Sequence, residues 1–266
     1  MPDPLLWDMQ RRTFERTAEA YDKFRPTYPN ELFEEVRSYA ALAPSDLILE
    51  IGCGTGQATL LLARWGHPVL AVEPAAAMAE VAQRKLAGSG NVDVRIATFE
   101  SCDLEPESFG LVLSAQAFHW LDPETRYRRI ADVLRSRGAL ALVWNTQVTP
   151  AHNRPFFERA QEIYLRHVPH MAHKGDFITE PGDEQLDDMA RSGLFDDLEV
   201  ARRPWHWTLP RDDYLGLMAT HSPHAALDAG VRDRLLGELG DLIDGEFGGE
   251  VTEYYVAEAF LGRKRG

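Results

Sequence analysis

The chain has 266 residues, with 28 lysines and arginines against 42 aspartates and glutamates, and its formal net charge is −14 at pH 7. Nucleic acids and anionic membrane surfaces both attract clusters of cations, so an acidic chain without a long basic run argues against both partners. Hydrophobic residues make up 44% and charged residues 26% of the chain, which is typical of a globular protein and not of a disordered or fibrous one.

The cysteines and the N-terminus indicate a reducing compartment. Cys53 and Cys102 form no CxxC pair, so we expect two free thiols. The first residues, MPDPLLWDMQRR, lack the apolar stretch of a secretory signal. The sequence also has no run of about 18 apolar residues that could span a membrane. We therefore expect a cytoplasmic protein.

The first segment with a helical period covers residues 31–43 and ends at Pro44. Beyond it, short apolar runs alternate with helical patterns at intervals of about 20 to 25 residues. This alternation predicts strands over 47–51, 68–72, 92–96, 111–114 and 138–144. It predicts helices over 57–65, 75–86 and 123–135, the last with Asp122 as N-cap and Pro123 as first residue.

The pattern changes after Asn145. Helices are predicted over 156–166, 184–191, 211–219 and 231–246, and two further strands over 198–209 and 251–261. We therefore predict an α/β fold with a doubly wound, Rossmann-like, mainly parallel sheet of seven strands. Helical insertions within 146–195 and 210–247 would form a cap over this sheet.

The sharpest motif, Glu50-Ile51-Gly52-Cys53-Gly54-Thr55-Gly56, joins a predicted strand to a predicted helix. Its glycines let the backbone approach a ligand closely, and the helix N-terminus offers free N–H groups. The dinucleotide pattern G-x-G-x-x-G fails because Gln57 occupies the sixth place, and the motif contains no P-loop lysine. The motif therefore favours a ligand without phosphates.

A second acid follows at the end of the next predicted strand. Glu73 stands 17 residues after Gly56, where a carboxylate in this kind of fold accepts hydrogen bonds from ribose hydroxyls. A lone glutamate at a strand end is more often a solvated surface residue. Beside the glycine turn, we favour the nucleoside-binding role for Glu73.

These residues resemble class I S-adenosylmethionine-dependent methyltransferases. The matching segments are residues 49–57 (LEIGCGTGQ), Val72-Glu73-Pro74 with Met78, and residues 97–100, 113–120 and 135–139. A closer resemblance, to trans-aconitate methyltransferases, rests on residues 21–29, 220–222 and 251–263. The resemblance implies a last strand antiparallel to the others. It also implies S-adenosyl-L-methionine as the cofactor and S-adenosyl-L-homocysteine as its product.

The resemblance also implies the residues that bind the cofactor. They are Tyr21, Arg25, Tyr28, Glu50, Gly52, Gly54, Gly56, Gln57, Glu73, Pro74, Met78, Thr98, Phe99, Glu100 and Gln116. The glycines would contact the methionine part, Glu73 the ribose, and Met78 and Phe99 the adenine. The N-terminal residues of the set would form a lid, with Arg25 pairing the methionine carboxylate.

One position of the adenine loop departs from the family pattern. Thr98 stands where many relatives carry an aspartate that accepts from the adenine amino group. A hydroxyl accepts more weakly, so Glu100 is the alternative acceptor.

His119 and Trp120 are the candidate catalytic residues. The implied acceptor site comprises His119, Trp120, Trp144, His221 and Ser222. His119 could serve as general base for a hydroxyl acceptor, because an imidazole titrates near neutral pH. We favour the simpler interpretation, in which it forms an aromatic wall with Trp120, whose indole N–H could donate to an acceptor carboxylate.

A metal site is not expected. His167, His170 and His173 are spaced by threes, but Pro169 interrupts the helix that would align them. A surface or pocket-lining cluster is the preferred interpretation.

We therefore expect a methyltransferase that acts on a small-molecule acceptor, at a carboxylate or hydroxyl oxygen, as a monomer or homodimer. One alternative is an enzyme of the same fold that uses the cofactor for non-methyl chemistry. The other is a cofactor-binding protein without turnover. The predicted organisation is an N-terminal lid and helix (1–43), a cofactor-binding core (44–145), and cap helices with the completing strands of the same sheet (146–266).

Overall fold

The computed structural model describes residues 18–172 and 180–266. They form a seven-stranded sheet in the order β3-β2-β1-β4-β5-β7-β6. Across the sheet the strands are β3 (Val92–Ile96), β2 (Val69–Glu73), β1 (Leu47–Ile51), β4 (Phe109–Ala115), β5 (Leu134–Val148), β7 (Glu250–Lys264) and β6 (Phe195–Pro210). The pairs from β3 to β5 are parallel, and β7 runs antiparallel to both β5 and β6. The predicted fold class is confirmed.

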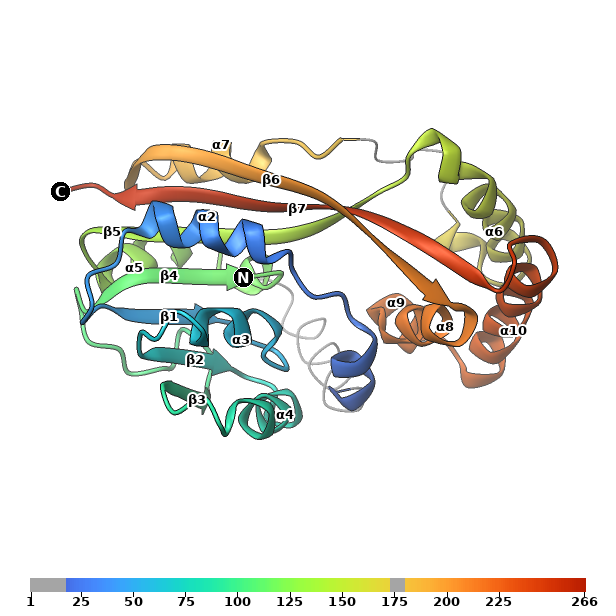
Figure 1. Cartoon of the computed structure of the whole chain (residues 1–266), viewed down its shortest axis with the longest axis horizontal. Coiled ribbons are helices and arrows are strands. Elements are labelled where there is room, and N and C mark those ends of the chain that lie inside the picture. The colour runs from blue at the N-terminus through green and yellow to red at the C-terminus, as the bar shows by residue number, and fades with distance from the viewer. Residues whose placement is uncertain (1–17, 173–179) are drawn as a thin grey trace.

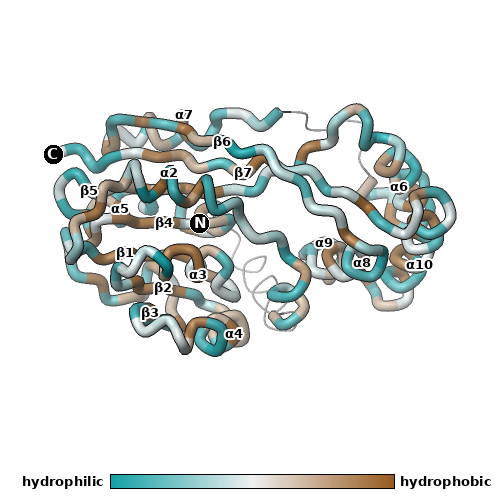
Figure 2. The backbone as a smooth tube through the Cα atoms, in the orientation of Figure 1, coloured by the Kyte–Doolittle hydropathy of each residue, from teal (hydrophilic) through white to brown (hydrophobic). Residues whose placement is uncertain are grey.

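The central strands are apolar along nearly their whole length because helices cover both faces of the parallel part. All residues of β4 except the last are buried. Figure 2 shows this as brown stretches along β1, β2 and β4. By contrast, β6 pairs with β7 on one side and alternates between buried and exposed residues.

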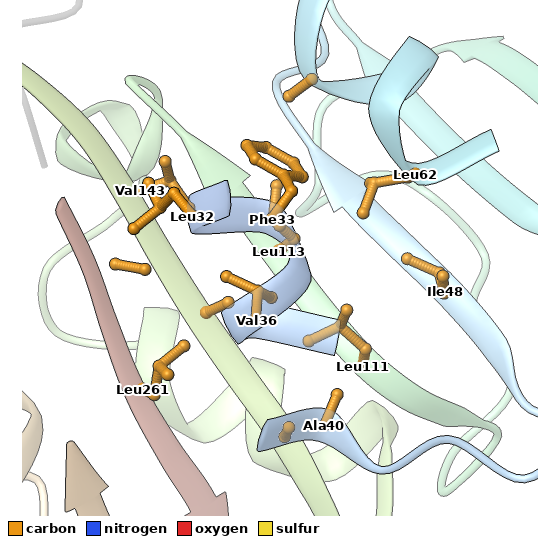
Figure 3. Packing of buried hydrophobic residues seen from close by; sticks show 14 of the residues in the cluster. Leu32, Phe33, Val36, Ala40, Ile48, Leu62, Leu111, Leu113, Val143 and Leu261 are labelled. Atoms are coloured by element: carbon orange, nitrogen blue, oxygen red, sulfur yellow. The ribbon is translucent and has the colours of Figure 1, made fainter. Parts of the chain in front are cut away.

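Three helices lie on one face of the parallel strands, namely α2 (Asn30–Ala40), α3 (Gln57–Ala63) and α4 (Ala76–Leu86). From α2, Leu32, Phe33 and Val36 pack against Leu111 and Leu113 of β4 (Figure 3). None of these five side chains is more than 1% exposed. Their burial explains why the helical period of this segment was visible in the sequence.

The opposite face carries α5 (Arg126–Val133) and α7 (Glu184–Arg191). Ile130 of α5 and Met189 of α7 belong to the same buried cluster as Leu140 and Leu142 of β5. Even-numbered residues of β5 therefore face this side, and odd-numbered residues face α2.

The remaining helices form a cap at the far end of the long strands (Figure 1). They are α6 (Arg154–His167), α8 (Arg211–Thr220), α9 (Ser222–Ala225) and α10 (Ala229–Glu246). Of these, α6, α8 and α10 share a buried cluster with Leu209 of β6 and Val251 of β7. Residues 18–29 lie between this cap and the parallel strands (Figure 1). Within the two described ranges, no helix has the length and apolar content that crossing a membrane requires.

The start of α5 differs from the prediction. The helix begins at Arg126, and neither Asp122 nor Pro123 occupies its first turn. Asp122 Oδ1 accepts from the Glu124 N–H at 3.1 Å, and the Asp122 carbonyl accepts from the Arg126 N–H at 2.9 Å. Asp122 therefore closes a turn ahead of the helix, a role that aspartate also favours.

The fifth strand is longer than the predicted 138–144. It runs from Leu134 to Val148, because its second half pairs with β7 in an antiparallel ladder from Ala139 to Val148. The polar residues that follow Trp144 hid this continuation from the periodicity.

Candidate active site

The glycine turn follows β1 at the carboxyl edge of the parallel strands and is held by Glu73 at the end of β2. Glu73 Oε2 accepts from the Gly54 N–H at 3.0 Å, and Oε1 accepts from the Ala75 N–H at 2.9 Å. The side chain is buried, and burial raises the pKa of Glu73 against the opposing effect of these two bonds. Each carboxylate oxygen keeps a further acceptor site, so Glu73 can also bind two hydroxyls.

A cavity of about 820 Å³ opens over this turn. Its lining includes ten of the predicted cofactor residues, namely Tyr21, Gly52, Gly54, Glu73, Pro74, Met78, Thr98, Phe99, Glu100 and Gln116. Phe99 and Met78 are 3% exposed and supply apolar walls. The cavity therefore combines one buried carboxylate with a mainly apolar surface.

Thr98 and Glu100, the two candidate acceptors of the adenine loop, differ in their contacts. The Thr98 hydroxyl donates to Ser101 Oγ at 3.0 Å and accepts from the Ser101 N–H at 3.1 Å. The exposed Glu100 lines the same cavity. The role of either residue toward an adenine stays a prediction.

A second cavity of about 750 Å³ adjoins the first, because Tyr21, Gln116 and Trp120 line both. The other residues of its lining are Arg25, Pro26, Tyr28, Gln57, His119, Asn145 and Ser222. This second cavity is much more polar than the first and contains a guanidinium group.

Arg25 supplies that charge. One terminal nitrogen, Nη2, donates to the Thr220 carbonyl at 3.1 Å, and the guanidinium carbon lies 4.9 Å from the centre of the Tyr21 ring. Within residues 18–172 and 180–266, no carboxylate forms an ion pair with Arg25. Arg25 is therefore suited to an anionic ligand group.

His119 and Trp120 lie together on the short 3-10 helix η1 (Phe118–Trp120), with ring centres 4.7 Å apart. His119 is an exposed residue. Partial removal of solvent from its ring, together with the charge of nearby Arg126, lowers the pKa of His119. Its imidazole is therefore neutral at pH 7 and able to accept a proton.

Four predicted residues do not line either cavity: Glu50, Gly56, Trp144 and His221. Glu50 is buried beneath the turn, where burial and the charge of Glu73 raise its pKa to about 7. Gly56 faces α4. Trp144 contacts Phe260, with ring centres 5.9 Å apart, in the cluster on the opposite face of the sheet.

His221 precedes Ser222 on the cap side of Arg25. Burial, Arg25 and His224 lower the pKa of His221 to about 3. Its predicted contact with the acceptor stays a prediction.

Asn145 was not singled out in the sequence. It lies in the second cavity with 8% exposure, one residue beyond the predicted Trp144. The alternation of Ala139, Ala141 and Val143 on the α2 face could have identified it, had the strand been continued past Trp144.

The expected absence of a metal site stays a prediction. His167 Nε2 lies 2.8 Å from Glu238 Oε1, and His173 lies outside the described residues. Among the residues that are described, no three His, Cys, Asp or Glu side chains gather as a metal site would require.

Comparisons with known proteins point to one class. Residues 49–142 match a methyltransferase domain model. An uncharacterized methyltransferase-like protein of Schizosaccharomyces pombe is 33% identical over 157 residues, which are 59% of this chain and 59% of that protein. An uncharacterized methyltransferase of Mycobacterium tuberculosis is 29% identical over 225 residues, covering 84% of this chain and 82% of its own length.

Solved structures agree. A protein of Anaeromyxobacter dehalogenans, named as a candidate type II methyltransferase, shares 26% identity at a TM-score of 0.64, with 91% of this chain and 98% of that one covered. The first curated relatives are matched over only 59% to 62% of their length. These matches show that residues 49–142 are similar to methyltransferase domains.

Proposed function

We propose that this chain transfers a methyl group from S-adenosylmethionine to an oxygen atom of a small-molecule acceptor. The observation that carries the proposal is the pairing of two cavities at the carboxyl edge of the sheet. One is apolar with the buried carboxylate of Glu73, and the other is polar with Arg25. Ligands of open α/β sheets bind at this edge.

In this proposal the first cavity holds the adenosine. Glu73 accepts from the ribose hydroxyls, Met78 and Phe99 contact the adenine, and Glu100 accepts from its amino group. The fit at Gly54 supports this role: a Cβ there would meet no atom of the chain within 4 Å and would project into open space. A side chain at this position would take up part of the space that the ligand needs.

The second cavity would hold the methionine part and the acceptor. Arg25 pairs the carboxylate of the amino acid, and Tyr21, Tyr28 and Gln57 complete the polar wall. His119, Trp120 and Ser222 then face the acceptor. The narrow junction at Gln116 and Trp120 is the point where the sulfonium methyl group and the acceptor oxygen would meet.

The bound cofactor supplies an activated methyl group, so the chain mainly positions the acceptor. A lone pair of the acceptor oxygen forms the new bond to carbon while the carbon–sulfur bond breaks and its electrons return to sulfur. Alignment of two reactants can supply about 7–11 kcal/mol of the barrier. A carboxylate acceptor needs no base, and a hydroxyl acceptor would lose its proton to the neutral His119.

Calorimetric titration with S-adenosylmethionine and S-adenosylhomocysteine tests the proposal. We expect dissociation constants in the micromolar range and no binding of NAD. Glu73→Ala should lose most of the affinity, since it removes the ribose acceptor and both bonds to the turn. Glu105→Ala removes one charge from an exposed site at the opposite ends of the strands and is the matched control.

Two outcomes would count against the proposal. Absence of binding by the folded wild-type protein would contradict the assigned cofactor. Binding without methyl transfer to any acceptor in a screen of small carboxylic acids and phenols would favour a protein that holds the cofactor without turnover.

A further inference from the structure

Asn145 connects three segments that are far apart in the sequence. Its Nδ2 donates to the Thr27 carbonyl at 2.9 Å, and its Oδ1 accepts from the Trp205 indole N–H at 3.1 Å. Its main-chain carbonyl accepts from Gln116 Nε2 at 3.2 Å. The partners fix the orientation of the amide, because a carbonyl requires the NH₂ end and an indole N–H requires the oxygen.

The Thr27 bond anchors the N-terminal wall of the second cavity. Arg25, Pro26 and Tyr28 flank Thr27 and line that cavity. The same segment also forms ion pairs with α4, between Glu19 and Arg84 and between Asp22 and Lys85, and Arg25 donates to the Thr220 carbonyl of α8. Among these anchors, Asn145 is the one that reaches the sheet.

The Gln116 bond anchors the other side of the junction between the cavities. Gln116 lines both cavities and has a φ of +56°, which is rare for a residue with a side chain. Such a conformation persists where its surroundings determine it. The bond to Asn145 and the bond from the Gln116 N–H to the Val143 carbonyl, at 2.9 Å, hold it in place.

We propose that Asn145 is a positioning residue for methyl transfer. It aligns the N-terminal wall with Gln116 so that Arg25 and Tyr28 face the methionine part of the cofactor. This inference rests on the proposed function, because it assigns the two cavities to the cofactor. A purely structural asparagine would stabilise the fold but would have no selective effect on residues 18–29.

The test compares Asn145→Ser with Trp205→Phe. Serine is too short to reach Thr27 or Trp205. Trp205→Phe removes the indole donor, together with part of the ring that stacks on Tyr255, and leaves the bond to Thr27 in place. Hydrogen exchange of residues 18–29 is measured without ligand, and the affinity for S-adenosylhomocysteine is measured by calorimetry. A lost hydrogen bond corresponds to roughly a threefold to tenfold change in an equilibrium.

We expect Asn145→Ser to speed exchange in residues 18–29 and to weaken S-adenosylhomocysteine binding by about tenfold. Trp205→Phe should stay within about twofold of the wild type in both readouts, although each variant lowers the melting temperature. Unchanged exchange and affinity in Asn145→Ser, or an equal loss in Trp205→Phe, would overturn the inference.

If Asn145→Ser does not fold, Asn145→Asp replaces it. The aspartate keeps an oxygen for Trp205 and removes the donor to Thr27, so the same two readouts apply. Failure of the wild type to bind S-adenosylhomocysteine would contradict the proposed function and not the inference about Asn145. The exchange measurement on the unliganded protein would still decide whether Asn145 holds the N-terminal wall.

Discussion

At the scale of single residues, the glycines of the turn have different physical tasks. Gly52 adopts a φ of +72°, and a Cβ there would lie 2.4 Å from the Cβ of Ala117. Gly54 adopts a φ of +56° but faces open space in the first cavity. One glycine thus permits the close approach of β1 and the segment after β4, and the other leaves room for a ligand.

Alanine substitutions separate these tasks. Gly52→Ala should lower the free energy of unfolding by about 2–4 kcal/mol, because backbone strain and a clash add together. Gly54→Ala introduces only backbone strain and should lower the free energy of unfolding by about 1 kcal/mol. It should also weaken S-adenosylhomocysteine binding by more than about tenfold. Urea unfolding and calorimetry measure the two effects.

Gly66→Ala is the control for backbone strain. Gly66 has a φ of +82°, and a Cβ added there would meet no atom within 4 Å. It lies in the turn that leads into β2 from the opposite edge of the sheet. The substitution should cost about 1 kcal/mol and leave affinity unchanged. Equal destabilisation by the Gly52 and Gly66 variants would contradict the close-approach argument.

At the scale of elements, β5 joins the two parts of the molecule. Leu134 and residues 139–143 pair with β4 in the parallel sheet, whereas residues 139–148 pair with β7, so the strand extends beyond β4 toward the cap. Asn145 therefore lies beyond the edge of the parallel sheet, where it lines the second cavity. Beyond it, α10 packs against α6 and α8 to complete the cap.

The N-terminus of α10 has a defined cap. Asp228 Oδ1 accepts from the N–H groups of Gly230 at 3.0 Å and Val231 at 3.3 Å. Asp228→Ala should therefore lower the unfolding free energy by about 1 kcal/mol in urea titrations. Asp228→Asn keeps the accepting oxygen and should lose only a few tenths of a kcal/mol.

Cofactor affinity serves as the second readout for Asp228, since this residue lines neither cavity. A loss of S-adenosylhomocysteine affinity in Asp228→Ala would show that the N-terminus of α10 and the binding site are coupled more tightly than their contacts indicate.

At the scale of the whole molecule, the cap and the long strands bury a carboxylate. Glu253 of β7 is fully buried, and Oε2 accepts from Gln147 Nε2 of β5. Burial raises the pKa of Glu253 to about 7 from an ordinary value of 4.5. Burial, and to a smaller extent the negative charge of Glu253, raises the pKa values of the surrounding tyrosines Tyr164, Tyr214 and Tyr255, which stay protonated in this range.

The raised pKa of Glu253 sets the sign of a pH effect. Between pH 4.5 and about 7 the folded protein binds more protons at Glu253 than the unfolded chain. Its contribution to stability is therefore full below the unfolded pKa and is lost as the pH rises through this window. Other titrating groups, including His224 with a pKa lowered to about 4, contribute equally to the pH dependence of the wild type and the variant.

Glu253→Gln removes this titration and keeps an acceptor for Gln147. The unfolding free energy of the variant minus that of the wild type should increase from pH 4.5 to 7, by at most about 3 kcal/mol. Urea titrations across this range measure it. A difference that is constant with pH would contradict the raised pKa.

Local sequence was enough to predict the parallel core and the place of the glycine turn at its edge. The strand Leu47–Ile51, the glycine turn and Glu73 form a continuous pattern, and the structure places them as predicted. Such patterns are visible because periodicity and backbone freedom are properties of neighbouring residues. The boundaries of 1–43, 44–145 and 146–266, and the acceptor residues, stay predictions.

Tertiary structure alone decided which side chains meet. Asn145, and not the predicted Trp144, lines the second cavity. Asn145 is part of the strand because β5 continues into a ladder with β7, which lies far along the chain. Arg25 donates to the Thr220 carbonyl because the cap lies beside residues 18–29 (Figure 1). The length of β5 and the packing of the cap arise from long-range contacts, so local periodicity does not encode where the strand ends or what it pairs with. The sequence by itself determined the glycine turn after the first strand, and the pairing of distant strands determined the cavity beside it.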